Sequence, residues 1–207
     1  LPFCDYENCR RGYKEDTPEE QEQFFLPTQD KEQIRTGINN KIFETFASEK
    51  AGEVALLGLL RIHKNLNKEQ LQKMTGKEWR YIRNNLNNLQ RKKRIEIAKT
   101  GKEIFYRYNF YNSFGTGETV INGLFLRLYF EGVITGAKLK VYLLLLHNWQ
   151  TNKTASQTEL AKKCGITRES VNRQIKSLSE KQYIIIRKIE NFKGCIVNGY
   201  YFPYENK

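Results

Sequence analysis

The side chains best suited to chemistry in this 207-residue chain lie in one polar stretch, Gly165–Leu178. Thr167 is a residue type that caps helix N-termini, where free backbone amides attract phosphate. Val171, Ile175 and Leu178 follow at the spacing of a buried helix face. Arginine pairs with guanine edges, asparagine with adenine, and a carboxylate accepts from cytosine. The stretch therefore predicts a DNA-reading helix, whose contacts are Thr167, Arg168, Glu169, Asn172, Arg173 and Lys176.

A second stretch, at residues 77–92, has the same amphipathic spacing but a different outer face. Its predicted DNA contacts are Lys77, Trp79, Arg80, Arg83 and Asn84, and we expect Asn85 and Asn88 at the surface as well. We expect Lys102, Lys193 and the run Arg91–Arg94 to contact phosphates, which position a protein without specifying bases. Two other interpretations stay open, because such helix faces are often only solvated and Trp79 can pack against a neighbouring hairpin.

The two stretches belong to an internal repeat with an offset of about 89 residues. The offset is about 87 upstream and near 83 at the segments that lead into each copy. Shared residues are apolar or glycine, and the outer residues differ, so the sequence predicts one scaffold built twice. The matched pairs include Leu71 with Leu160, Gly76 with Gly165, Ile82 with Val171, Val54 with Val141, and Ile38-Asn39 with Ile121-Asn122.

Apolar periodicity and turn residues predict the elements that hold these stretches. In the first copy we expect helices at about 49–64, 68–74 and 77–92, followed by a hairpin at 95–108. In the second copy we expect helices at about 136–149, 157–164 and 168–181, followed by a hairpin at 183–202. Gly76 and Gly165 mark the turns. The predicted fold class is mainly α with small β-hairpins (α+β), as two tandem winged-helix domains.

The predicted domain organisation has four parts. Residues 1–30 form an acidic arm with a short helix, 31–111 the first winged-helix domain, 112–118 a linker and 119–207 the second winged-helix domain. The net charge of +12 is unevenly distributed, because residues 1–30 carry three basic and eight acidic groups, whereas residues 61–110 carry fourteen and four. A basic field on the two copies favours a polyanionic partner.

Several other classes of function lack support in the sequence. No apolar run approaches the roughly 18 residues of a membrane span, so we expect a soluble protein without a membrane partner. Four cysteines and two histidines have no paired zinc-site spacing, although Cys4 and Cys9 leave open a bridge or a metal. No phosphate loop or nucleophile motif is present. We therefore expect no catalytic site, no metal and no cofactor.

Two resemblances extend this interpretation. Residues 165–178 resemble the recognition helix of the catabolite activator family, which implies that Arg168, Glu169 and Arg173 read base edges. The resemblance covers about 25 residues and the cyclic-nucleotide barrel of that family has no counterpart here, so its small-molecule control is not implied. The segment Thr119–Lys188 resembles the helix-turn-helix domain of plasmid and phage replication proteins, in which a short I-x-N-x-L-F entry precedes the winged helix.

We therefore expect a sequence-specific protein that binds double-stranded DNA, in the cytoplasm with the nucleoid, and regulates transcription. The alternative is a plasmid- or phage-type replication initiator or replisome organiser that binds origin repeats. A third class is an adaptor that works through protein surfaces. A homodimer and a replication or transcription protein partner stay open.

Overall fold

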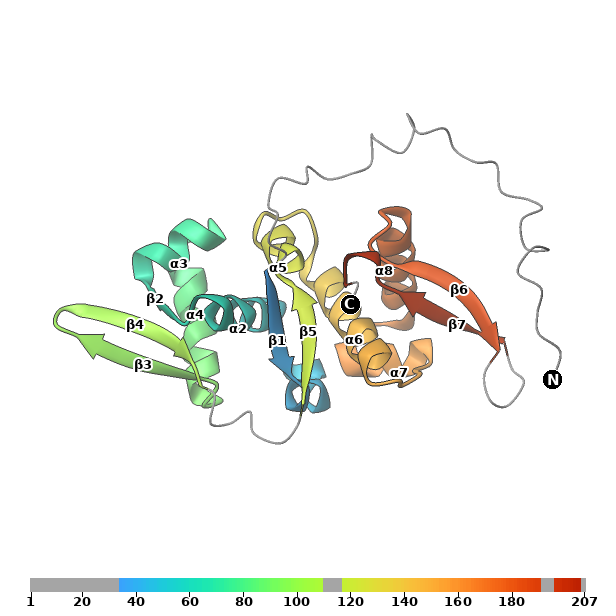
Figure 1. The fold of residues 1–207 in the computed structure, drawn as a ribbon, viewed down its shortest axis with the longest axis horizontal. Coiled ribbons are helices and arrows are strands. Elements are labelled where there is room, and N and C mark those ends of the chain that lie inside the picture. The colour runs from blue at the N-terminus through green and yellow to red at the C-terminus, as the bar shows by residue number, and fades with distance from the viewer. Residues whose placement is uncertain (1–33, 110–116, 191–195, 206–207) are drawn as a thin grey trace, which may run out of the picture. The chain divides into compact units, whose positions relative to one another are not determined.

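The computed structural model describes residues 34–109, 117–190 and 196–205. Residues 33–207 form one compact unit (Figure 1). The predicted arm, Cys4 and Cys9, residues 112–116 of the predicted linker, and the hairpin tip with Lys193 lie outside the described residues.

The first half of this unit begins with a strand and ends with a hairpin. Its elements are β1 (Arg35–Asn39), the 3-10 helices η3 (Asn40–Glu44) and η4 (Phe46–Ser48), α2 (Ala51–His63), β2 (Asn65–Asn67), α3 (Lys68–Thr75), α4 (Trp79–Arg91), β3 (Ile95–Thr100) and β4 (Glu103–Tyr108).

The second half repeats this order with α5 in place of η3 and η4, without a counterpart of β2, and with an added 3-10 helix after its hairpin. Its elements are β5 (Glu118–Asn122), α5 (Gly123–Phe130), α6 (Gly136–Gln150), α7 (Gln157–Cys164), α8 (Arg168–Glu180), β6 (Ile185–Glu190), β7 (Ile196–Tyr201) and the 3-10 helix η6 (Pro203–Glu205). The predicted helices and hairpins are confirmed to within a few residues. Helices with small antiparallel sheets make the described chain an α+β protein.

The strands form three small antiparallel sheets in the described residues. In the first hairpin Thr100 pairs with Glu103, which leaves Gly101 and Lys102 as a two-residue turn. Gly101 has a φ of 62°, as such a turn requires. β2 adds a third strand beside β4, which the sequence analysis did not predict. In the second hairpin the described pairs run from Ile185 with Tyr201 to Glu190 with Ile196.

The central helices α2 and α6 are buried on all sides. Every residue of 52–60 and of 138–148 is buried, including Lys138 and Lys140. The apolar spacing of Val54, Leu57 and Leu60 in α2 is that of one broad buried face. The second face is covered because α2 packs on α5 and α6 as well as on α4, and α6 packs on η3 as well as on α8.

The two predicted leading segments pair with each other, as β1 and β5 form a two-stranded antiparallel sheet. Around this sheet the halves share buried contacts. The Phe43 ring stacks on His147 with centroids 4.2 Å apart. Thr119 donates its hydroxyl proton to Asn40 Oδ1 at 2.8 Å and lies 2.8 Å from His147 Nδ1. The halves are therefore joined by a shared core as well as by the chain.

The C-terminal segment closes the second half over an aromatic cluster. Phe125 stacks on Tyr142 at 3.7 Å between ring centroids, and Phe202 packs edge-on against Tyr142. The buried Glu205 carboxylate accepts from the Asn122 backbone N–H at 2.9 and 3.0 Å and from the Tyr142 hydroxyl at 2.9 Å. These bonds fix η6 against the junction of β5 and α5.

Candidate nucleic-acid interface

The polar stretch Gly165–Leu178 forms the turn after α7 and most of α8. At the start of α7 the Ser156 hydroxyl accepts from the Glu159 N–H at 3.2 Å, and the Glu159 carboxylate accepts from the Ser156 N–H at 2.7 Å. Gly165 ends α7 with a φ of 67°, a left-handed conformation that costs other residues about 1–2 kcal/mol. Thr167 then caps α8, since its hydroxyl oxygen accepts from the Ser170 N–H at 3.2 Å. These caps fix the direction in which α8 leaves the turn.

The two faces of α8 separate as predicted. Val171, Ile175 and Leu178 are buried in the core. The six side chains predicted to contact DNA in this half, Thr167, Arg168, Glu169, Asn172, Arg173 and Lys176, are all exposed. Helical spacing divides them, because Glu169, Arg173 and Lys176 follow one another at i, i+4 and i+7 and form a single stripe. Arg168 and Asn172 begin a neighbouring stripe.

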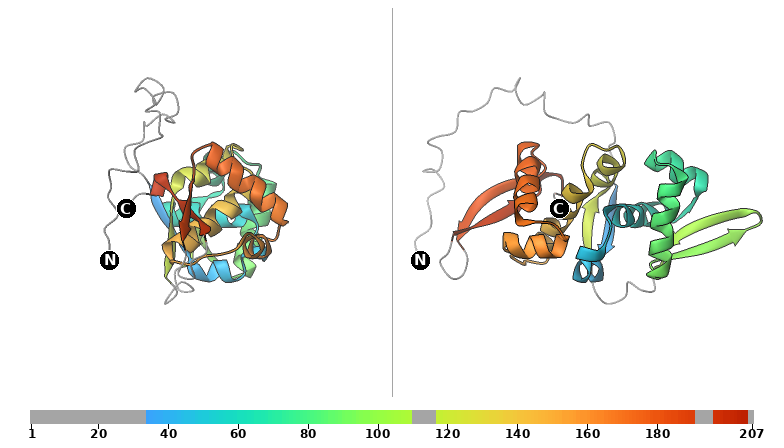
Figure 2. Two further views of the ribbon diagram at one scale, coloured as in Figure 1. Left: turned by 90° about the vertical axis from the view of Figure 1, so that its right-hand side faces the viewer. Right: turned by 180° about the vertical axis from the view of Figure 1, so that it is seen from behind.

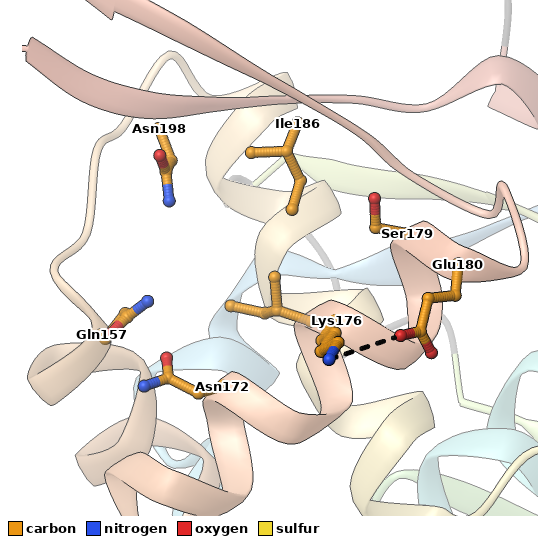
Figure 3. Close-up of a pocket in the computed structure, with 8 residues that line it drawn as sticks. Gln157, Asn172, Lys176, Ser179, Glu180, Ile186 and Asn198 are labelled. Carbon is orange, nitrogen blue, oxygen red and sulfur yellow. Dashed lines mark ion pairs between the residues drawn. The ribbon is translucent and has the colours of Figure 1, made fainter.

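A shallow groove of about 400 Å³ separates α8 from the β6–β7 hairpin (Figure 3). Asn172 and Lys176 line it on the helix side. Lys176 Nζ lies 3.8 Å from Glu180 Oε1, but both side chains are well exposed, so this pair contributes little and leaves the lysine available to an anion. A nucleic-acid strand along α8 would therefore meet donors on the edge of the helix that faces the hairpin.

Four polar residues that line this groove were not among the predicted contacts: Gln157, Ser179, Glu180 and Asn198. Asn198 lies directly opposite Lys188 in the hairpin. Alternation along the strands would have placed it on the same face as Ile186 and Tyr200. The alternation along the strands could have indicated that Asn198 faces the groove, but only if the register of the hairpin had been known.

Helices α3 and α4 present the corresponding surface of the first half. Asn67 and Gln70 form a reciprocal cap at the start of α3, with both bonds at 3.0 Å. Gly76 ends it with a φ of 62°. Arg80, Arg83 and Asn84 are exposed on α4 as predicted, while Lys77 is half-buried and precedes the helix, which starts at Trp79.

Trp79 faces the hairpin of its own half. Its ring centroid lies 6.1 Å from that of Tyr106 on β4, and Lys68 Nζ lies 5.7 Å from the ring. Burial raises the pKa of the Tyr106 hydroxyl, and the positive charge of Arg83 acts in the opposite direction. The packing of Trp79 favours its structural interpretation, whereas Arg83 stays at the surface.

Two asparagines of α4 that we expected at the surface lie elsewhere. Asn85 is buried, and its side-chain amide donates to the Tyr81 carbonyl at 2.9 Å. Asn88 is half-buried and donates to Glu53 Oε1 at 2.9 Å. The prediction was wrong because the start of α2 covers this part of α4, and hydrogen bonds compensate the buried amides.

In the basic run at the exit of α4 that we predicted to contact phosphates, Lys92 and Arg94 contact buried carboxylates instead, while Arg91 and Lys93 are exposed. Lys92 Nζ lies 2.9 Å from Glu49 Oε2 and 2.5 Å from Glu53 Oε2, and Arg94 lies 2.7 Å from Glu49 Oε2. Burial alone would raise the pKa of Glu49, but hydrogen bonds from Lys92 and Arg94 outweigh it and leave that pKa below its usual value. Lys92 and Arg94 therefore hold α2, α4 and β3 together.

Other groups that can carry chemistry are accounted for by packing. Cys164 is buried under α8, and burial raises the pKa of its thiol to about 12. His147 is buried between the halves, and burial lowers its pKa to about 4. Within the described residues no group of three or more His, Cys, Asp or Glu side chains could hold a metal ion. No described helix has the length and apolar character needed to cross a membrane.

We predicted phosphate contacts at two hairpin tips, Lys102 and Lys193, and the structure describes Lys102. Lys102 is exposed in the turn between β3 and β4, away from the buried base of the hairpin. The structure thus gathers the predicted residues into two separate surfaces, one on α4 with the first hairpin and one on α8.

Comparison with known proteins agrees with this geometry for the second half. Searches of curated proteins and of solved structures found no match to the chain. Residues 137–193, which span α6, α7, α8 and β6, match the family described as the Crp-like helix-turn-helix domain, and this match supports a helix-turn-helix DNA-binding domain in the second half of the chain.

Proposed function

We propose that this protein binds specific sequences of double-stranded DNA through two winged-helix units and regulates transcription. Helix α8 carries the proposal, because it is capped and anchored by a buried face and presents Arg168, Glu169 and Arg173 to solvent within the segment similar to Crp-like domains. Those side chains suit base edges in a major groove. The proposal includes no catalytic step and no cofactor, and it places the protein in the cytoplasm.

The correspondence between the halves supports a second reader. Helices α3 and α7 have eight residues each and α4 and α8 have thirteen each. Both pairs begin 89 residues apart, as Lys68 and Gln157 and as Trp79 and Arg168. This offset matches Arg80 with Glu169, Arg83 with Asn172, and Asn84 with Arg173. The two units would therefore prefer different base sequences.

Selection of bound duplexes from a random pool, followed by competition with unselected DNA, tests the proposal. Arg168→Ala and Arg173→Ala should each weaken binding to the selected site by about 1–3 kcal/mol and change little on random DNA. Lys193→Ala should weaken both by a similar factor, since a phosphate contact carries no sequence information. Equal losses on both DNAs for all three variants would contradict the assignment of α8 as a reader.

A second candidate function is replication initiation at origin repeats. The observation that favours it is the β5–α5 lead-in, in which Asn122 caps α5 by accepting from the Leu124 N–H at 2.9 Å. Asn122, Leu124 and Phe125 take the N, L and F positions of the I-x-N-x-L-F pattern of plasmid and phage replication proteins, and Val120 takes its I position. Footprinting separates the candidates: protection of several repeats within an origin supports initiation, and protection of an operator that overlaps a promoter supports regulation.

A further inference from the structure

The pairing of β1 with β5 has an internal symmetry. With the offset of 83, Thr36, Gly37 and Ile38 correspond to Thr119, Val120 and Ile121. In the sheet Gly37 faces Val120, its own counterpart, while Thr36 faces Ile121 and Ile38 faces Thr119. The outer pairs, Arg35 with Asn122 and Asn39 with Glu118, exchange in the same way. A local two-fold axis therefore passes between Gly37 and Val120.

Hydrogen bonds at both ends of the strand pair obey the same axis. The Asn40 N–H donates to the Gly117 carbonyl at 3.1 Å, and the Gly123 N–H donates to the Ile34 carbonyl at 2.7 Å. These two bonds exchange under the offset of 83. The capping bonds are also equivalent, because Asn39 accepts from the Lys41 N–H at 2.8 Å as Asn122 accepts from Leu124.

Helix packing extends the axis beyond the strands. α2 contacts α6, its counterpart, while the contact of α2 with α5 corresponds to that of α6 with η3. Within these, Leu126 packs on α2 beside Gly58, where a Cβ atom would lie 2.6 Å from Leu126 Cδ1. Its counterpart Phe43 stacks on His147 of α6. In Figure 1, η3 and α5 lie at opposite ends of the strand pair, and the two hairpins project at opposite ends of this unit.

Contacts that exchange in this way are those of an isologous dimer interface, in which the same surface is used twice. Here both copies of that surface belong to one chain. α4 packs on α2 as α8 packs on α6, so the rotation that relates the central helices also relates the two predicted recognition helices.

We propose that one chain reads a single bipartite DNA site whose two unlike half-sites lie in inverted orientation. The proposal rests on the proposed function. A two-fold axis in the protein aligns with a two-fold axis of the duplex, so α4 and α8 meet the two half-sites in opposite directions. Direct repeats would need a translation between the readers. The strand pair and the buried helices between the readers fix the half-site spacing, and no second chain is needed.

A face-exchange variant makes the orientation visible. Four exposed residues of α4 are replaced by their counterparts on α8: Arg80→Glu, Arg83→Asn, Asn84→Arg and Asn87→Lys. Trp79 is retained because it packs on Tyr106. Both readers then present the same side chains at these four positions, while the contact assigned to Arg168, the counterpart of Trp79, stays on α8 alone. The variant is used to select duplexes from a random pool. The reciprocal exchange on α8 (Glu169→Arg, Asn172→Arg, Arg173→Asn, Lys176→Asn) repeats the test with the other face.

The variant should select an inverted repeat built from the half-site that α8 recognises in the natural chain, with one chain bound per duplex by sedimentation. When five or ten base pairs are inserted between the half-sites, one half-site should no longer contribute to the binding affinity. A direct repeat, a motif with one half-site only, or two chains per duplex would overturn the inference. Lys41→Ala, an exposed change that alters net charge by the same amount, should select the natural motif. A natural chain that selects no sequence contradicts the proposed function, and this inference with it.

Discussion

Replacement of Lys92 by methionine separates a structural role from a DNA-binding role. The change keeps most of the aliphatic stem and removes the charge that contacts two carboxylates, whose side chains are only 1% and 2% exposed. Without Lys92, Glu53 still accepts a hydrogen bond from the Asn88 amide, and Glu49 still accepts one from Arg94. Both carboxylates would then be buried with less compensation, so the variant should be less stable.

The magnitude follows from the burial of the partners. Removing one member of a buried ion pair costs about 3–5 kcal/mol. Lys92 is itself 31% exposed and Arg94 still neutralises Glu49, so we expect about 2 kcal/mol here. For a chain of this length that lowers Tm by roughly 4–8 °C.

Two assays decide the outcome. Urea unfolding gives the free energy of unfolding, with Lys41→Ala as an exposed-lysine control that should stay within about 0.5 kcal/mol of the natural chain. The salt dependence of DNA binding should not change, whereas loss of a phosphate contact would reduce its logarithmic slope by about 0.9. An unchanged stability together with the reduced slope would refute our placement of Lys92.

Three further predictions concern other parts of the fold. The pKa of His147 in the folded chain is about 4, against an ordinary value of 6.5. The contribution of neutral His147 to stability is therefore fully present above pH 6.5 and is lost as the pH falls toward 4. In urea unfolding, the free energy of unfolding should decline less between pH 7 and pH 5 for His147→Gln than for the natural chain. Gly165→Ala should cost more stability than Gly76→Ala. Both positions need a left-handed backbone, but only at Gly165 would the added Cβ atom approach a backbone atom, the Ala47 carbonyl oxygen at 3.1 Å. Equal losses of stability in thermal unfolding would count against this close contact. Arg173→Lys should retain non-specific binding but lose about 1 kcal/mol or more on the selected site, since lysine lacks the planar fork of arginine; undiminished discrimination in competition binding would argue against a bidentate contact.

Much of the local structure could be predicted from the sequence because its signals are local. The turn glycines, the cap residue Thr167, and the apolar spacing of Val171, Ile175 and Leu178 depend only on neighbours in the chain. These features placed α7 and α8 and the exposed face of α8.

What the sequence analysis missed depends on contacts between distant segments. The burial of Asn85 and the pairing of Lys92 with Glu49 and Glu53 arise because the start of α2 covers the end of α4. A basic residue beside a helix end has the same local pattern whether it faces solvent or a buried carboxylate. The pairing of β1 with β5 was also not predicted, because two short strands about 80 residues apart carry no local sign of their partner.

The most direct test of the account is the ratio of dissociation constants of the natural chain for a selected duplex and for a scrambled duplex of the same length, measured by competition at physiological salt. A protein that reads bases with α8 should bind the selected duplex about 10³-fold more tightly or better. Equal dissociation constants for the two duplexes would contradict sequence-specific recognition by this protein.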